Sequence, residues 1–493
     1  MSNPAVATAG GSPATKPVEK TPSYAWPCLI VSLLAAVGIV FAWMWLPGVT
    51  FPVFKSWLAE NNSFFANPAN FELLSNVMGL VPIGALIMAL PTTFLVRKFG
   101  AKTTTLIGVG CAVVGTAISA ASVGGNFYLF LAGRFILGLG LSTTVVSGPT
   151  CVSMWFPDST RGRAMAIWSC WAPVGIFLSN FVNDGVYHAV GSDMGALQWV
   201  WGAVALAFGI LFAVVFRDPR GDERSQVSPE RKPLKAVLQF FKSRQLWCLI
   251  IMFAIFNYMN YAFSQYLKTW LQTPELLGGF GWDATTAGLW GGLIVACGAL
   301  APLGGLILDK TPKSKKYICV VAGILGLTIC SALAFRAEFF IPYVLFFCIG
   351  NMMLNACCRP LVPTFVFKGG ATAVAFGLSF LTLGQYAGQI VTSYALAPFS
   401  ESLTAASNVA ITAKQGVLAA GGTPADFGPA SAQAAQEALA QGIHVDPMLA
   451  FWALVPVGVV GCILSFGVKP SKKQIEAGPA GKPSDKDASA IKH

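Results

Sequence analysis

Long apolar runs alternate with short polar segments along most of this chain, and the runs are about as long as a membrane is thick. A helix of roughly 20 residues, rising 1.5 Å per residue, crosses a hydrocarbon core of about 30 Å. Lipid offers the backbone no hydrogen-bond partner, so a chain that crosses it must be helical. Twelve spans are predicted, near residues 24–46, 73–96, 103–123, 127–155, 164–183, 197–216, 246–267, 284–308, 317–336, 340–363, 371–398 and 448–468.

The composition agrees with a membrane protein. Hydrophobic residues make up 55% of the 493 residues and charged residues 11%, against about 25% charged in an ordinary soluble domain. A soluble protein of this length needs more polar surface. The first span follows a Pro/Ala/Thr-rich tail, has no small-residue cleavage site and is too long for a signal peptide, so we expect it to be retained.

Basic residues predict how the chain crosses the membrane. With both ends of the chain in the cytoplasm, 27 of the 32 Lys and Arg residues fall on the cytoplasmic side, as the positive-inside rule requires. The net charge of +11 then mostly reflects topology, and no nucleic-acid partner is expected. We predict a monomeric, multi-pass protein of the plasma (inner) membrane, surrounded by the lipid bilayer.

A basic segment, residues 217–245, divides six spans from six. Within it Leu234, Val237, Leu238 and Phe241 are spaced as the apolar face of a short interfacial helix. The predicted fold is all-α and integral to the membrane, with 12 transmembrane helices in two pseudo-symmetric six-helix bundles. Its parts are a disordered cytoplasmic tail (1–23), an N-terminal bundle (24–216), the cytoplasmic linker (217–245), a C-terminal bundle (246–468) with an extracytoplasmic loop (399–447), and a cytoplasmic tail (469–493).

The two halves repeat each other weakly. PTTFLVRKFGAK, after the second span, corresponds to GGLILDKTPKSKK after the eighth, with Arg97 and Asp309 212 positions apart. A weaker correspondence joins Gly175 and Gly384, 209 positions apart. Internal duplication at a near-constant offset is typical of secondary transporters built from repeats.

Three segments together resemble the motifs of the major facilitator superfamily. GGLILDKTPKSKK resembles its G-x-L-a-D-r-x-G-r-k loop, RFILGLG resembles the R-x-x-x-G-x-G pattern of its fourth span, and WFPDSTRGRA is similar to the loop that follows. The resemblance implies two bundles that rock around a central cavity and expose substrate to each side in turn. Arg97 departs from the pattern, because the family usually has aspartate there, so the charge pair of the first half must be altered or absent.

Charged residues near the inner ends of spans are candidates for gating contacts between the halves. A carboxylate at a helix end can pair with cations or helix N-termini across the interface in only one conformational state. Helix capping and topology are the alternative explanation. The gating candidates are Arg97, Asp309, Lys310, Arg161 and Arg163.

Arg134 places a cation inside the fourth predicted span. Such a charge costs roughly 2.5–3.5 kcal/mol on insertion scales. Two roles stay open. Either Arg134 packs against the bundle, satisfied by carbonyls or a polar side chain, or it faces a water-filled cavity and pairs with an anionic substrate.

Amide and aromatic side chains recur at helical spacing in several spans. Lipid tolerates polar side chains only where they meet one another or water, so we expect some to join helices and others to line a cavity. Arg359 shares a face with the amides of its span but is interpreted as a marker of the cytoplasmic boundary. The candidates for substrate binding are Arg134, Asn76, Trp168, Trp171, Asn257, Tyr261, Asn351, Asn355, Gln385 and Gln389.

No Asp or Glu lies deep in a predicted span. Glu72, at the outer end of the second span, is therefore the candidate for coupling to H+ or Na+. The excess of cations and amides favours an organic anion or a polar neutral solute over a lipophilic cation. No metal site and no cofactor are expected, because the three His lie in loops or tails and the 12 Cys show no metal-ligand spacing.

We predict a secondary active, alternating-access symporter or antiporter of a small organic solute, with an organic anion such as a carboxylate as the leading class. A coupling ion or a counter-substrate would be its partner. The spans hold no His/Asp/Glu or Cys/His constellation, which argues against an enzyme. Two alternatives stay open: a drug or lipophile exporter of the same fold, which would use the 14 Trp and 36 Phe, and a non-transporting sensor, which would share every motif.

Overall fold

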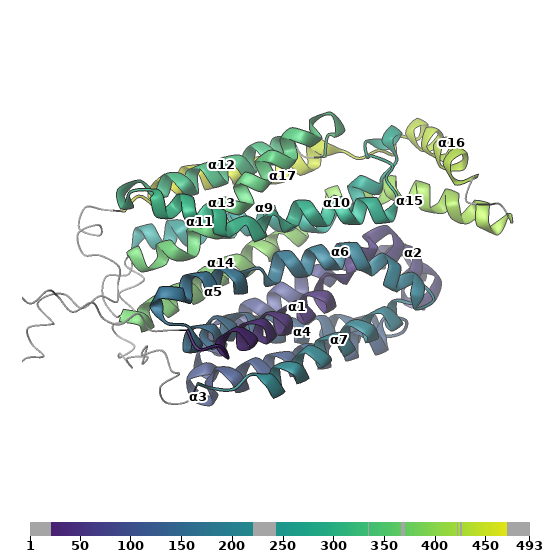
Figure 1. Cartoon of the computed structure of the whole chain (residues 1–493). Coiled ribbons are helices and arrows are strands. Elements are labelled where there is room, and N and C mark those ends of the chain that lie inside the picture. Colours follow the sequence, from purple (N-terminus) through teal and green to yellow (C-terminus); the bar gives the residue numbers. More distant parts are fainter. Residues whose placement is uncertain are drawn as a thin grey trace, which may run out of the picture.

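The computed structural model of the chain describes residues 21–219, 243–333, 335–365, 370–421, 423 and 426–470. Helices account for all regular secondary structure in these residues, and they run side by side in two groups (Figure 1). We call the end where the first helix begins the inner end, following the orientation predicted from the cations. The predicted interfacial helix around Leu234 lies outside the described residues, as do most of the two tails.

The first group occupies the lower half of Figure 1. Its longest helix runs down and back through two predicted spans, because Gly100, at φ 81°, allows a sharp reversal that other residues rarely adopt. The helices of this group are α1 (Ala25–Val49), α2 (Phe51–Asn61), α3 (Ser75–Ser122), α4 (Phe127–Trp155), α5 (Asp158–Ser169), α6 (Trp171–Ala189) and α7 (Met194–Val215), with 3-10 turns η1 (Ser63–Ala66) and η2 (Pro68–Leu74).

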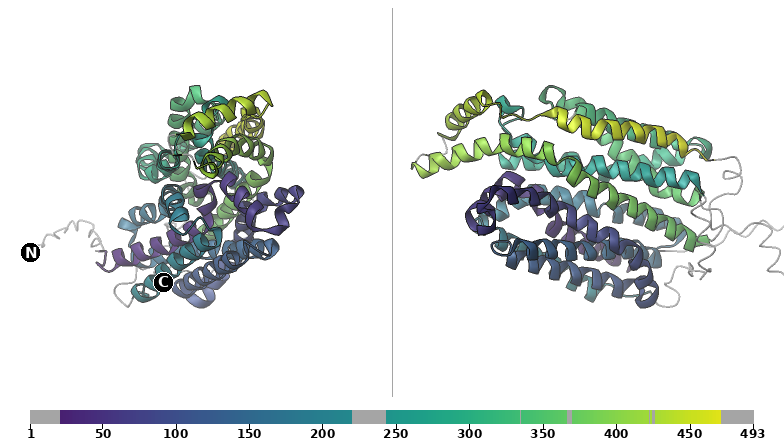
Figure 2. Two further views of the ribbon diagram at one scale, coloured as in Figure 1. Left: turned by 90° about the vertical axis from the view of Figure 1, so that its right-hand side faces the viewer. Right: turned by 180° about the vertical axis from the view of Figure 1, so that it is seen from behind.

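The second group holds a broken span and a helical outer extension. The predicted span 284–308 is interrupted by a 3-10 turn, and much of the predicted loop 399–447 forms two helices, α15 and α16, which project from the outer end (Figures 1 and 2). The helices are α9 (Arg244–Gln272), α10 (Ala284–Ala296), α11 (Ala301–Lys310), α12 (Tyr317–Leu333), α13 (Phe340–Phe365), α14 (Gly370–Ala395), α15 (Ala397–Ala419), α16 (Phe427–Ala440) and α17 (Pro447–Gly467), with 3-10 turns η5 (Glu275–Leu277), η6 (Cys297–Leu300), η7 (Lys313–Lys315) and η8 (Ala337–Phe339).

The glycines of RFILGLG explain how tightly α4 packs between the two limbs of α3. A side chain at Gly138 would collide with the backbone of Val81, and one at Gly140 would collide with the backbone of Gly108. Small residues allow transmembrane helices to approach this closely. The motif therefore builds the scaffold on which Arg134 is mounted.

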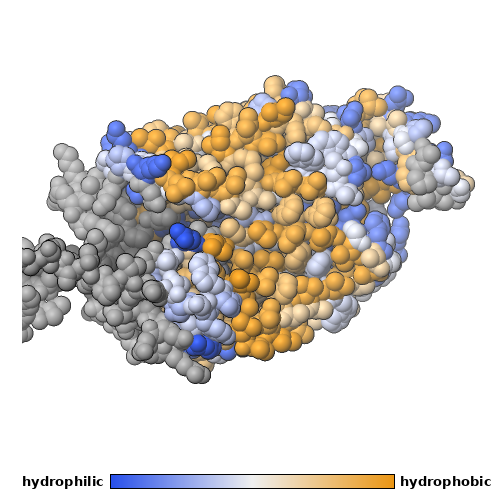
Figure 3. Space-filling model, in the orientation of Figure 1, coloured by the Kyte–Doolittle hydropathy of each residue, from blue (hydrophilic) through white to orange (hydrophobic). Residues whose placement is uncertain are grey.

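The outer surface is suited to lipid. Apolar side chains cover the middle of the face in Figure 3, and polar ones gather toward its ends. Among the described residues, ten helices are long and apolar enough to cross a membrane, and Tyr317–Leu333 is a shorter apolar helix. The protein is therefore a multi-pass membrane protein, while the total of twelve spans stays a prediction.

The two groups of helices meet along two seams. At one seam α14 lies beside α3, and at the other α10 lies beside α6, with α9 also touching α1. The domain boundaries predicted from the sequence stay predictions. The seams nevertheless bring the polar side chains of both groups into one central region.

Candidate functional site

A row of backbone carbonyls near the outer end of α1 is satisfied by side chains of other helices. The helix is irregular at Met44 (φ −96°, ψ 18°), and Pro47 lacks the N–H that would bond the carbonyl of Trp43. Arg134 compensates from α4, since it donates through Nη2 to the oxygen of Trp43 at 2.8 Å and through Nη1 to that of Ala42 at 2.9 Å. The interruption of α1 therefore frees carbonyl oxygens, and Arg134 donates hydrogen bonds to them.

Arg134 bonds mainly to backbone carbonyls in this structure. Its Nε also donates to the carbonyl of Val77 at 3.1 Å, and the side chain is 1% exposed. These contacts match the packing alternative for Arg134, in which carbonyls satisfy the buried cation. Substrate binding by Arg134 stays a prediction.

Lys268 is a second buried cation, and the sequence analysis did not identify it as a candidate. It is 2% exposed, and its Nζ donates to the carbonyl of Gly48 at the end of α1 and to that of Asn180 in α6 at 3.2 Å. Lys268 directly follows the predicted span 246–267, where a cation usually marks the membrane boundary. The signal available in the sequence was its spacing, because Lys268 follows Asn260 and Ser264 at steps of four and so lies on the same helix face.

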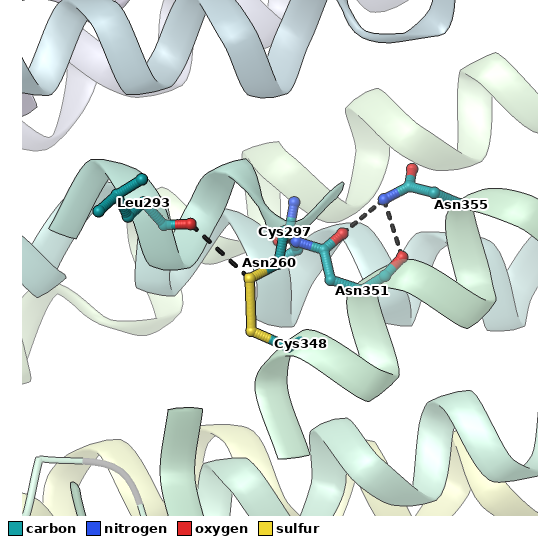
Figure 4. Close-up of a disulfide and its surroundings, with 6 residues drawn as sticks. All are labelled: Asn260, Leu293, Cys297, Cys348, Asn351 and Asn355. Atoms are coloured by element: carbon teal, nitrogen blue, oxygen red, sulfur yellow. Dashed lines mark hydrogen bonds between the residues drawn. A yellow bond between two sulfur atoms is a disulfide. The ribbon is translucent and has the colours of Figure 1, made fainter. Parts of the chain in front are cut away.

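Asparagine side chains form a network near the middle of the second group (Figure 4). Asn351 donates through Nδ2 to Oδ1 of Asn260 at 3.0 Å and accepts a hydrogen bond from Nδ2 of Asn355. One turn before Asn351, Cys348 is joined by a disulfide to Cys297 of η6. The network unites two of the predicted binding residues, Asn351 and Asn355, with Asn260.

The break in the eighth span lies against this network. A side chain added at Gly298 would contact Oδ1 of Asn351 and Nδ2 of Asn355, both at 3.4 Å, and Pro173 of α6 at 3.5 Å. Pro173 belongs to the first group of helices, so the network reaches the interface between the groups. Interrupted helices beside polar side chains are typical of substrate sites in transporters.

Arg359 is central to a third polar cluster, on the inner side of the asparagines. Among the described residues its guanidinium has one hydrogen-bond partner, Oε1 of Gln385, at a long 3.5 Å. The guanidinium also interacts electrostatically with the hydroxyl of Tyr386, next to Ser142 of α4. Arg359 is partly buried, on the helix face that also carries Asn351 and Asn355, and its role as a marker of the cytoplasmic boundary stays a prediction.

A cavity of about 420 Å³ opens between the two groups at the outer end. Its lining combines α2, η2 and α3 of the first group with α9, α14 and α15 of the second. Gln265 is 1% exposed, and among the described residues neither its Oε1 nor its Nε2 has a hydrogen-bond partner. The polar residues of the lining are Lys55, Glu72, Ser75, Gln265, Tyr266, Ser393, Ser400, Glu401 and Thr404.

Hydrogen bonds join the groups at both ends. At the outer end Tyr394 Oη donates to Oδ1 of Asn76 at 2.9 Å, and Tyr261 Oη donates to the carbonyl of Met78 at 3.4 Å. Toward the inner end the hydroxyls of Thr93 and Ser379 are 3.3 Å apart. Two predicted binding residues, Asn76 and Tyr261, thus contact the opposite group in this conformation.

The other predicted site residues are spread over the molecule. Trp168 and Trp171 are buried with ring centroids 6.2 Å apart, and Trp168 Nε1 donates to Oγ of Ser32 at 3.2 Å. Asn257 donates to the carbonyl of Phe253 in its own helix at 2.8 Å. Gln389 is buried, and its Oε1 has no partner among the described residues.

The gating candidates are described only in part. Arg163 and Lys310 are exposed at the inner end. The side chains of Arg97, Asp309 and Arg161 lie outside the described part of the chain. Glu72, the coupling candidate, lines the outer cavity and is exposed. These roles stay predictions.

A family model described as Major Facilitator Superfamily matches residues 48–393. The chain belongs to this superfamily. Membership places it among membrane transporters rather than enzymes, as the motifs around Arg134 and Asp309 predicted.

Solved structures of other superfamily members share its fold. A bacterial homolog of the human lysosomal transporter Spinster, in an inward-facing and occupied conformation, has a TM-score of 0.63 at 14% identity, covering 94% of this chain and 100% of that chain. A D-xylose-proton symporter has a TM-score of 0.60 at 14% identity, covering 92% and 99%.

Curated relatives match over shorter stretches. Sugar transport protein MST7 of Oryza sativa is 30% identical over 133 residues, which are 27% of this chain and 24% of that protein. The galactose-proton symporter of Escherichia coli is 26% identical over 140 residues, 28% of this chain and 29% of that protein. The chain thus spans well under half the length of these two relatives.

Proposed function

We propose that the protein is a secondary active transporter that carries a small organic anion, such as a carboxylate, by alternating access between its two groups of helices. Arg359 is the observation that supports this class of substrate most directly. Coupling to H+, to Na+ or to a counter-substrate is part of the same proposal. The plasma (inner) membrane and cytoplasmic termini are proposed from the distribution of basic residues.

Arg359 has hydrogen-bonding capacity that the described residues around it leave unused. A guanidinium carries five N–H donors, and among the described residues only Gln385 accepts from this one. The hydroxyls of Tyr386 and Ser142 nearby are buried and have no hydrogen-bond partner in the described chain. A carboxylate could accept two parallel bonds from the guanidinium, the strongest arrangement available to that pair, and further bonds from the two hydroxyls.

The electrostatics of the interior favour the same class. Arg134, Lys268 and Arg359 are bonded to carbonyl or amide oxygens, and no described carboxylate lies within ion-pair distance of them. Three cations in a medium of low dielectric create a positive potential that attracts anions and repels cations. A lipophilic cation is therefore the substrate class that fits least well.

A neutral, sugar-like solute is the second candidate. The outer cavity is lined by hydroxyls and by the unpartnered amide of Gln265, which offers one donor and one acceptor to a ligand with adjacent hydroxyls. Two of the relatives are named as sugar or galactose transporters. This alternative places the substrate against Gln265 rather than against Arg359.

A thermal-shift screen of the purified protein separates the two classes. A ligand that binds the folded state stabilises it by RT ln(1 + [L]/Kd), about 2.7 kcal/mol at a hundred times Kd. We expect mono- and dicarboxylates to raise the unfolding temperature, and sugars, amino acids and lipophilic cations to leave it unchanged. A rise with sugars alone would replace the first candidate by the second.

Two variants test whether the thermal shift arises from a carboxylate bound at Arg359. Arg359→Gln should abolish the shift caused by the carboxylate, because the amide cannot supply the charge. Arg244→Gln, which changes an exposed arginine at the inner end of α9, is the matched control and should retain the shift. A carboxylate shift that survives in Arg359→Gln would move the anion site elsewhere.

A further inference from the structure

We propose that Lys268 is a built-in cation that latches the outer ends of the two groups of helices, and that outward opening requires its release. The inference rests on the alternating-access part of the proposed function and not on the identity of the substrate. It assigns a positioning role to a residue that touches neither Arg359 nor the asparagine network in the hydrogen bonds described above.

The contacts of Lys268 cross the interface. Lys268 belongs to α9 of the second group, and both of its carbonyl partners, Gly48 and Asn180, belong to the first. Two glycines of α10 leave room for the side chain of Lys268. A side chain added at Gly288 would lie 3.5 Å from Nζ and 2.6 Å from the carbonyl oxygen of Asn180, and one at Gly291 would lie 3.6 Å from Cα of Lys268. The interface is therefore shaped around an extended lysine.

The end of α1 is a favourable place for a cation. The last carbonyls of a helix lack intrahelical donors and carry the negative end of the helix dipole. Gly48 is the penultimate residue of α1, and Lys268 caps its carbonyl from the opposite group. Transporters commonly hold a coupling cation against the carbonyls of interrupted helices. Here the ammonium of Lys268, on α9, occupies the position beside helix-end carbonyls that a coupling cation has in such transporters.

The latch has two discrete states. With the outer ends together, the ammonium is buried and bonded to the two carbonyls. No described carboxylate forms an ion pair with it, although Asp184 of α6 attracts it electrostatically. If the outer ends separate, water must replace the carbonyls, because a buried ammonium without partners would be prohibitively costly. A partly opened state with a dry, unpaired Lys268 is excluded, so the contact switches as a unit.

The first experiment measures opening directly. Thr269, next to Lys268 and 2% exposed, is replaced by Cys as a reporter, and a membrane-impermeant maleimide is added from outside to proteoliposomes. Lys268→Met removes the charge while keeping most of the length of the side chain. We expect it to raise the labelling rate of the reporter about tenfold, the ratio that corresponds to ~1.4 kcal/mol. Labelling of the protein without the reporter corrects for native cysteines.

Two further variants separate a latch from a packing role. Lys414→Met, on the exposed outer helix α15, should leave labelling unchanged, and Lys268→Arg should remain close to wild type because it keeps the charge. In Lys268→Ala, added methylammonium should bring the labelling rate back toward wild type, as a free cation fills the vacated position. Lost packing would not be rescued by a cation.

The decisive outcomes differ from those of the anion test. Unchanged labelling in a folded Lys268→Met protein would overturn the latch. If Lys268→Met does not fold, the Lys268→Ala protein purified in methylammonium takes its place, and labelling that stays constant when methylammonium is removed would overturn the latch. The assay contains no substrate, so failure of the anion screen leaves this result standing.

Discussion

Arg134 donates through Nη2 to the carbonyl of Trp43 at 2.8 Å, and that carbonyl is the one that Pro47 leaves without a helical donor. The two features are far apart in sequence and complementary in space. A proline interrupts α1, and a cation from α4 satisfies the acceptors released by the interruption. Charge burial at Arg134 and irregularity in α1 thus explain each other.

Replacing Arg134 by Ala should destabilise the protein severely. The change leaves the carbonyls of Ala42, Trp43 and Val77 without the donor that they have now. The carbonyl of Trp43 then has no donor, which costs roughly 1–3 kcal/mol, and the removal of a large buried side chain leaves a cavity. We therefore expect a loss of about 3 kcal/mol and a much lower unfolding temperature in detergent. Arg336→Ala, at the outer surface, is the control and should have little effect. An Arg134→Ala protein as stable as the control would show that the hydrogen bonds of Arg134 to these carbonyls do not stabilise the fold.

Pro47→Ala should partly compensate for the loss of Arg134. Alanine supplies an N–H at position 47 that can bond the carbonyl of Trp43. The cost of Arg134→Ala should therefore be smaller in the Pro47→Ala background, with a coupling of about 1 kcal/mol in a double-mutant cycle. Unfolding temperatures of the four proteins give the coupling. Strict additivity would mean that the two residues act independently.

Gln265→Leu should leave the protein at least as stable and should slow transport. The buried amide of Gln265 has no hydrogen-bond partner among the described residues, so a leucine of similar size removes a desolvation cost of roughly 1–3 kcal/mol. We expect an equal or higher unfolding temperature together with slower uptake in proteoliposomes. Gln433→Leu, on the exposed helix α16, serves as the control. A variant that loses stability but transports normally would show that the amide has a structural role.

The hydrogen bonds of Asp283 should make the stability of the protein depend on pH. Hydrogen bonds from the hydroxyl and N–H of Thr286 and from the N–H of Thr285 hold the pKa of Asp283 below its usual range. A depressed pKa contributes stability that is present above the unfolded value, about 3.9, and is lost as pH falls through the folded value.

The difference in unfolding temperature between wild type and Asp283→Ala should therefore be largest near neutrality and should shrink in acid. Asp283 caps the N-terminus of α10, where loss of a cap typically costs about 1 kcal/mol. Asp283→Asn keeps a capping oxygen without the charge and is the matched variant. A difference that grows as the pH falls would contradict the assignment.

Sequence patterns predicted the scaffold because they act locally. Apolar run lengths predicted the spans, and RFILGLG, with Gly138 and Gly140, indicated the superfamily to which the chain belongs. The segment 399–447 was predicted only as an extracytoplasmic loop, and its alanines and glutamines are strong helix formers, so that α15 and α16 contain most of it.

The site could not be predicted to the same depth. Whether Arg134 meets a substrate or carbonyls depends on the irregularity at Met44, which no hydropathy pattern encodes. Lys268 and Arg359 lie near the ends of their spans, where a cation usually marks the membrane boundary, and only the packing of α1 and α14 against them shows otherwise. Their partners are more than 25 residues away or in the other group of helices, beyond the reach of periodicity.

Uptake of a labelled carboxylate into proteoliposomes tests the central claim most directly. The probe is the carboxylate that gives the largest thermal shift, and galactose is measured in parallel. We predict saturable carboxylate uptake by the wild type and by Arg244→Gln, none by Arg359→Gln, and no uptake of galactose by any of them. Saturable galactose uptake, with carboxylate uptake absent or indifferent to Arg359→Gln, would contradict the account.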